Sequence, residues 1–114
     1  MAGFVTFDMD SQERTWSTAN WVFAGVVDHV LSLVDDVDIV HELTVCKHHQ
    51  NVDLKELEDE NPEMFRRVIV ALQKTCDQII AGEVKVSVDG VVLDEESQTQ
   101  YREEVSRLAK LLKG

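Results

Sequence analysis

The sequence predicts an α+β domain in which about four helices pack against a small antiparallel sheet of two or three strands. Over residues 61–82, apolar side chains recur at three- and four-residue intervals, which is the period of a helix with one buried face. Over residues 84–88 the period changes to two, and Asp89-Gly90 follows as a typical hairpin turn. Because 114 residues fit one hydrophobic core, we assign residues 1–114 to a single compact domain.

The first predicted element is a strand over residues 4–9, in which Val5, Phe7 and Met9 occupy one face. We expect this strand to pair with the later hairpin as its third strand. A helix over residues 19–34 follows. Its apolar residues have helical spacing, and its length favours a helix although β-branched residues also suit a strand.

Asp35 and Asp36 can cap a shorter helix that extends to about residue 47, because aspartate side chains accept hydrogen bonds from free amides at a helix start. Its buried side would contain Ile39, Leu43 and Cys46. A polar joint is expected over residues 48–51. The next segment, residues 53–60, carries five acidic residues and only two apolar ones, so we expect a short helix or an ordered loop.

The main core helix is predicted to begin at Asn61, with Pro62 at its first position, and to end at Gly82. Its apolar stripe contains Phe65, Val68, Ile69, Leu72, Cys76, Ile79 and Ile80. In the hairpin that follows, the even-numbered valines should face the core. The last helix is expected to start at Asp94, and its buried face contains Tyr101, Val105, Leu108 and Leu112.

The net charge of −11 is distributed unevenly along the chain. Residues 1–63 contain 14 acidic and three basic residues, whereas residues 64–114 contain eight of each. This asymmetry disfavours direct contact with nucleic acid or an anionic membrane and favours encounter with a basic partner. The alternative is a surface that only keeps the protein soluble.

Composition also indicates the compartment. The longest apolar run, residues 21–27, is far shorter than the roughly 20 residues that a bilayer-spanning helix needs. Two cysteines, Cys46 and Cys76, are too few for a disulfide scaffold, so we expect reduced thiols in a cytoplasmic protein.

One candidate metal site contains Glu42, Cys46, His48 and His49, since the first, second and fourth of these share a helix face. Their spacing matches no standard zinc signature. The alternative interpretation makes Cys46 a small core residue and the histidines a solvated helix end, and we therefore expect no metal and no other cofactor.

Asp8 and Asp10, after the strand at the N-terminus, resemble the first motif of the haloacid dehalogenase phosphatases. In that family the two carboxylates hold Mg²⁺ and attack phosphate. The resemblance covers about seven residues, and Gln12 stands where threonine or valine is expected. No alternating series of strands and helices follows, so we interpret both aspartates as caps at a strand end.

The sequence contains no recognisable feature that would activate a nucleophilic side chain. Cys76 lies on the predicted apolar stripe, and Cys46 has histidines nearby but no accompanying oxyanion-hole signature. The five glycines are scattered singly, which excludes a Gly-rich phosphate loop. We therefore predict that the protein is not an enzyme.

The sequence instead favours an acidic module that binds, and neutralises or regulates, a basic protein. In physical type it resembles immunity proteins and antitoxins that cap cationic nuclease toxins, so a nuclease toxin is one such partner. Trp16, between polar neighbours, is the expected aromatic anchor. The predicted binding residues are Trp16, Asp35, Asp36, Asp38, Glu42, Asp53, Glu56, Glu58, Asp59 and Glu60.

A monomer or homodimer is expected. Besides the metal site, an open alternative is a homo-oligomeric structural subunit that uses the last helix.

Overall fold

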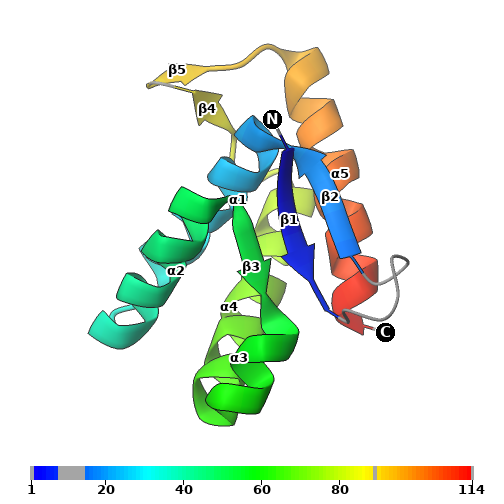
Figure 1. The fold of residues 1–114 in the computed structure, drawn as a ribbon. Helices are drawn as coiled ribbons and strands as arrows, with labels where there is room; N and C mark the ends of the chain where they lie inside the picture. The colour runs from blue at the N-terminus through cyan, green and yellow to red at the C-terminus, as the bar shows by residue number, and fades with distance from the viewer. Residues whose placement is uncertain (1, 8–14, 89, 114) are drawn as a thin grey trace.

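The computed structural model describes residues 2–7, 15–88 and 90–113, and it confirms the α+β class (Figure 1). These residues form five helices and two small sheets. In chain order the elements are β1 (Ala2–Thr6), β2 (Thr15–Ala19), α1 (Asn20–Leu33), α2 (Val37–His49), β3 (Asn51–Asp53), α3 (Leu54–Glu60), α4 (Pro62–Ile80), β4 (Ser87–Val88), β5 (Val91–Val92) and α5 (Glu95–Lys113). The helices number five because the acidic segment before Asn61 forms α3.

The main sheet is mixed, with the strand order β2-β1-β3. Val5 at the centre of β1 lies opposite Trp16 in the antiparallel partner β2 and opposite Val52 in the parallel partner β3. The predicted all-antiparallel sheet was therefore wrong, and so was the pairing of the first strand with the hairpin. β4 and β5 form a separate two-stranded sheet, because β2 and β3 already occupy both sides of β1.

Two expectations from the sequence fall outside the described residues. Met9, at the end of the predicted first strand, is one of them. The other is the pair Asp8 and Asp10, which was interpreted as capping that strand.

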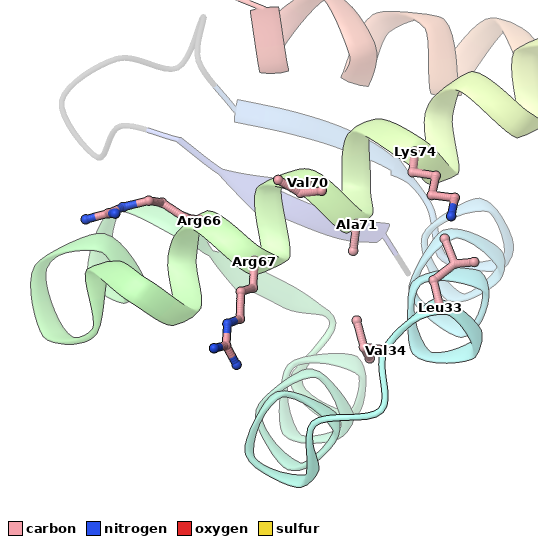
Figure 2. A pocket seen from close by; sticks show the side chains of 7 residues that line it. All are labelled: Leu33, Val34, Arg66, Arg67, Val70, Ala71 and Lys74. Atoms are coloured by element: carbon pink, nitrogen blue, oxygen red, sulfur yellow. The ribbon is translucent and has the colours of Figure 1, made fainter.

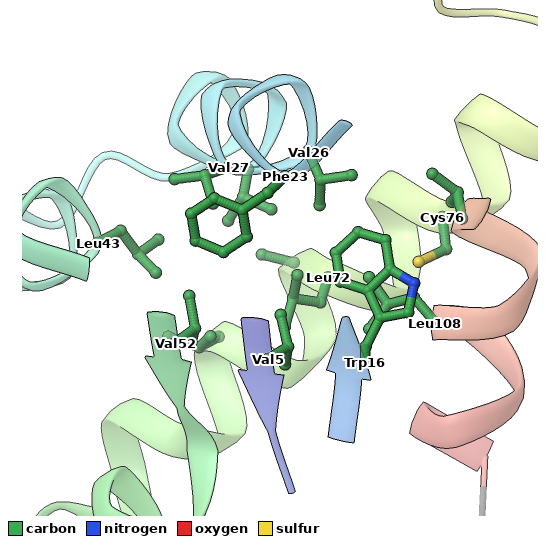
Figure 3. Close-up of a cluster of buried hydrophobic side chains, with 14 of the residues drawn as sticks. Val5, Trp16, Phe23, Val26, Val27, Leu43, Val52, Leu72, Cys76 and Leu108 are labelled. Carbon is green, nitrogen blue, oxygen red and sulfur yellow. The ribbon is translucent and has the colours of Figure 1, made fainter. Parts of the chain in front are cut away.

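The core lies between the sheet and the helices that cover it. In Figure 3, Phe23, Val26 and Val27 of α1 face the strand residues Val5, Val52 and Trp16, with Leu72 of α4 close by. The predicted buried faces of α4 and α5 are confirmed at their centres, where Val68, Leu72, Cys76, Ile79, Tyr101, Val105 and Leu108 are buried. Ile80 is exposed instead, because it is the last residue of α4 and is turned about 100° from Ile79.

Polar side chains cap α2, α4 and α5 where the sequence predicted, whereas α1 begins after Ala19 without a side-chain cap. The Asp36 carboxylate accepts a hydrogen bond from the Asp38 amide at 2.9 Å, so Asp36 caps α2. Asn61 caps α4 in the same way through the amide of Met64, at 3.2 Å. These bonds satisfy amides that have no partner within the helix.

The hairpin is shorter than predicted because a side chain replaces part of its ladder. The buried Gln98 amide accepts from the Val86 backbone nitrogen and donates to the Val86 carbonyl oxygen, both at 2.8 Å. Val86 is buried as predicted, and Val84 is half-buried. The side chain of Val88 and the residue Asp89 lie outside the description, whereas Gly90 has the positive φ of 81° that a tight turn favours.

Candidate functional site

A cleft of about 250 Å³ opens between α2, β3 and α3, and we call it the acidic cleft. Its lining residues are Glu42, Val45, Cys46, His49, Asn51, Asp53, Glu56, Leu57 and Glu60. Four of these are acidic and all four were predicted as binding residues.

Three elements bring the carboxylates of the acidic cleft together. Glu42 lies on α2, four residues before Cys46 and therefore on the same face. Asp53 ends β3 and caps α3, where its carboxylate accepts a hydrogen bond from the Glu56 amide at 3.0 Å. Glu56 and Glu60 are four residues apart on α3, so they are neighbours on its surface. Residues of α2, β3 and α3 thus line the same cleft.

Like charges dominate the electrostatics of this cleft. The neighbouring carboxylates of Glu60, Asp53 and Glu42 raise the pKa of Glu56, with Glu60 making the largest contribution. Elsewhere on α3, Lys55 pairs with Asp59 at 3.4 Å. Within the described part of the chain, no lysine or arginine forms an ion pair with Glu42, Glu56 or Glu60. The repulsion in the cleft is therefore not compensated by the described residues.

Cys46 lies half-buried in the wall of the acidic cleft. Its Sγ is 4.0 Å from Glu42 Oε1, and burial together with the Glu42 charge raises the pKa of the thiol to about 11. His49 also lines the cleft, while His48 is exposed and contacts His49 edge-on. Across residues 2–7, 15–88 and 90–113, no three His, Cys, Asp or Glu side chains are grouped closely enough to hold a metal ion.

The remaining predicted acidic residues do not line the cleft. The Asp36 carboxylate accepts a hydrogen bond from Arg67 Nη1 at 2.8 Å, so its charge is neutralised. Lys55 is within 4.0 Å of both Asp59 and Glu58. Asp35 and Asp38 are exposed near the start of α2. Of the predicted acidic residues outside the cleft, Asp36, Glu58 and Asp59 are therefore paired, whereas Asp35 and Asp38 form no ion pair within the described residues.

Trp16 is not an exposed anchor, and that prediction was wrong. Its side chain is 0% exposed in the core, and its indole Nε1 donates a hydrogen bond to the Glu104 carbonyl oxygen at 2.9 Å. Its polar neighbours in the sequence were misleading because adjacent residues of a strand point to opposite faces. Trp21 is half-buried and stacks on Tyr101, with ring centroids 6.3 Å apart.

A second hollow was not predicted from the sequence. It lies between the end of α1 and the middle of α4 and measures about 390 Å³, and we call it the cationic groove (Figure 2). Its lining residues are Leu33, Val34, Arg66, Arg67, Val70, Ala71 and Lys74. A sequence signal for the groove does exist, because Arg66, Val70 and Lys74 follow one another at four-residue steps and therefore share a helix face.

Comparison with models of known families, with curated proteins and with solved structures gave no match to this chain. Of the helices described, none combines the length and the apolar character that crossing a membrane requires.

Proposed function

We propose that the protein binds a basic segment of a partner protein in the acidic cleft. The observation that carries this proposal is the convergence of Glu42, Asp53, Glu56 and Glu60 from α2, β3 and α3. Their mutual repulsion raises the pKa of Glu56. A lysine or arginine side chain placed between them would remove that repulsion and gain charge-assisted hydrogen bonds.

The surroundings of the cleft support binding more than catalysis. Cys46 lines the cleft, and its raised pKa keeps it a neutral thiol at physiological pH. The excess acidic charge of the chain would accelerate encounter with a cationic protein. A partner that uses the same basic surface to bind nucleic acid would be blocked while bound here, as in an immunity-protein or antitoxin-like inhibitor.

A short polyarginine peptide labelled with fluorescein tests the cleft directly. The test variant replaces Glu42, Glu56 and Glu60 with glutamine, which preserves size and removes three charges. The control variant makes Asp77→Asn, Glu83→Gln and Glu103→Gln, three exposed acidic residues outside the cleft. Both variants have the same net charge, so any difference between them reports position.

We expect the cleft variant to bind the peptide at least about tenfold more weakly than the control variant, because neighbouring carboxylates act together on one cation. Added salt should weaken the binding of the native protein, since the Debye length falls to about 8 Å at physiological ionic strength. Equal weakening in both variants would mean that binding depends on the total negative charge and not on the cleft, and it would contradict the proposal.

A further inference from the structure

We propose that the cationic groove binds an acidic segment of another protein, one that carries apolar side chains between its carboxylates. This interface is separate from the acidic cleft, because none of the residues that line one lines the other. The domain would then bind partners of opposite charge at two sites.

The floor of the groove is aliphatic. Leu33 and Val34, at the end of α1 and just beyond it, lie across from Ala71 of α4 (Figure 2). Val70 adds an exposed apolar surface on α4, since this residue is 63% exposed. Aliphatic side chains of a partner would lose contact with water here, which favours association.

The rim of the groove is positively charged on a protein whose net charge is −11. Arg67 is held in place by Asp36 at 2.8 Å and by Glu63 at 3.2 Å, and the two acceptors use only part of its five N–H donors. Arg66 and Lys74 are exposed and form no ion pair within the described residues. The groove therefore offers unpaired cations beside an apolar floor.

The shape of the groove favours a peptide over a small molecule. Small-molecule sites enclose most of their ligand, whereas this groove is open along α4. The aliphatic floor would suit leucine or valine side chains, while nucleic-acid sites that combine cations with stacking use aromatic rings, and no aromatic residue lines this groove. Carboxylates at the edges of such a peptide would meet Arg66, Arg67 and Lys74.

Titration with a designed peptide tests the proposal. The probe has glutamates around leucines at helical spacing and a fluorescein label. Two matched peptides serve as comparisons, one with glutamine in place of glutamate and one of polyglutamate alone. Amide chemical shifts of the ¹⁵N-labelled native protein locate the contact without any variant, and the expected shifts lie at Leu33, Val34, Val70 and Ala71.

Variants separate charge from apolar contact. Replacing Arg66 and Lys74 with glutamine should weaken binding of the probe at least about tenfold, because two unpaired cations are removed. Val70→Ser should weaken it several-fold. The control replaces Lys85 and Lys110, two exposed lysines outside the groove, with glutamine and should change the affinity less than about twofold.

Five results would overturn the proposal. Polyglutamate that binds as tightly as the probe would indicate a nonspecific attraction for anions. Equal weakening in the groove and control variants would show the same. Shifts located elsewhere would place the contact outside the groove, and no binding by the probe would contradict the proposal directly. If the native chain self-associates in sedimentation and the groove variant does not, the occupant is a second copy of this chain and not an acidic segment of another protein.

Discussion

The indole Nε1 of Trp16 donates its hydrogen bond to the backbone carbonyl oxygen of Glu104, 88 positions away in the sequence. This bond connects β2 with α5, and the indole ring fills the core between them. A buried tryptophan with a satisfied N–H combines a large apolar surface with a polar contact that specifies its orientation. Trp16 is therefore a structural residue of the core.

Replacing Trp16 should separate these two contributions. Trp16→Ala is expected to lower the free energy of unfolding by about 3–5 kcal/mol, because it leaves a large cavity. Trp16→Phe should cost less, about 1–3 kcal/mol, since an aromatic ring remains but the Glu104 carbonyl oxygen loses the indole N–H. Urea denaturation measures both. A loss below about 1 kcal/mol for Trp16→Ala would contradict the burial described here.

Gln98 should be essential for holding the hairpin against α5. Its side chain also donates to the Leu93 carbonyl oxygen at 3.1 Å, in addition to its two bonds with Val86. Gln98→Leu would leave buried backbone groups unsatisfied, so we expect a loss of at least about 2 kcal/mol and faster hydrogen exchange at the Val86 amide. Gln100→Leu, on an exposed position of the same helix, is the control and should leave exchange at Val86 unchanged.

The apolar stripe of α4 should show graded sensitivity. Leu72 is 4% exposed, so Leu72→Ala is expected to destabilise by about 2–5 kcal/mol. Ile69 is only half-buried, and Ile69→Ala should cost less than Leu72→Ala in the same denaturation experiment. Val70→Ala, at an exposed position, should stay within about 0.5 kcal/mol of the native protein. The reverse order for Ile69 and Leu72 would mean that α4 is rotated relative to the core.

The helices could be predicted from the sequence because their information is local. The stripe on α4, its cap at Asn61 and the cap at Asp36 are all set by residues a few positions apart. Strand pairing was not predictable in the same way. β3 has three residues, too few to show alternation, and its parallel position beside β1 depends on contacts across about 45 residues.

The candidate site was predictable in composition but not in detail. The sequence shows that residues 53–60 are acidic, yet it does not show that β3 places Asp53, Glu56 and Glu60 opposite Glu42. It also does not show that Arg67 neutralises Asp36, because the two residues are 31 positions apart. The pairing of charges is a tertiary property, and it separates the carboxylates of the cleft from those of Asp36, Glu58 and Asp59.

The two thiols should be poorly reactive in the native state. Burial raises the pKa of Cys46 to about 11 and that of Cys76 to about 12. At pH 8 the thiolate fraction of Cys46 is thus about 100-fold below that of a thiol at the ordinary value of 9.0. We expect slow reaction of both thiols with Ellman's reagent and rapid reaction after unfolding in urea. Fast reaction of one native thiol would contradict this description of its surroundings.

Chelator should leave the native protein unchanged. Glu42, Cys46 and His49 share the acidic cleft without forming a group that could hold a metal ion. Protein purified without chelator should therefore contain no stoichiometric zinc, and its melting temperature should be the same with and without EDTA. One zinc per chain, lost together with stability in EDTA, would instead support the metal-binding alternative.

The acidic cleft should lower the stability of the folded protein in a pH-dependent way, and one substitution should remove this effect. The carboxylates of Glu60, Asp53 and Glu42 raise the pKa of Glu56 in the folded protein, whereas its pKa in the unfolded chain stays near the ordinary value. Ionisation of Glu56 is therefore less favourable in the folded state. The resulting loss of folding stability is absent below the pKa that Glu56 has in the unfolded chain. It grows as the pH rises and is complete above the pKa that Glu56 has in the folded protein.

Glu56→Gln should accordingly raise the melting temperature at pH 7 and have little effect near pH 3, where Glu56 is protonated in both states. The gain at pH 7 should shrink with added salt, because salt screens the repulsion between exposed carboxylates. Glu103→Gln, at an exposed position of α5 outside the cleft, provides the matched control and should give a smaller gain. If the two variants melt alike at every pH, the carboxylates of the cleft do not interact strongly enough to favour a bound cation.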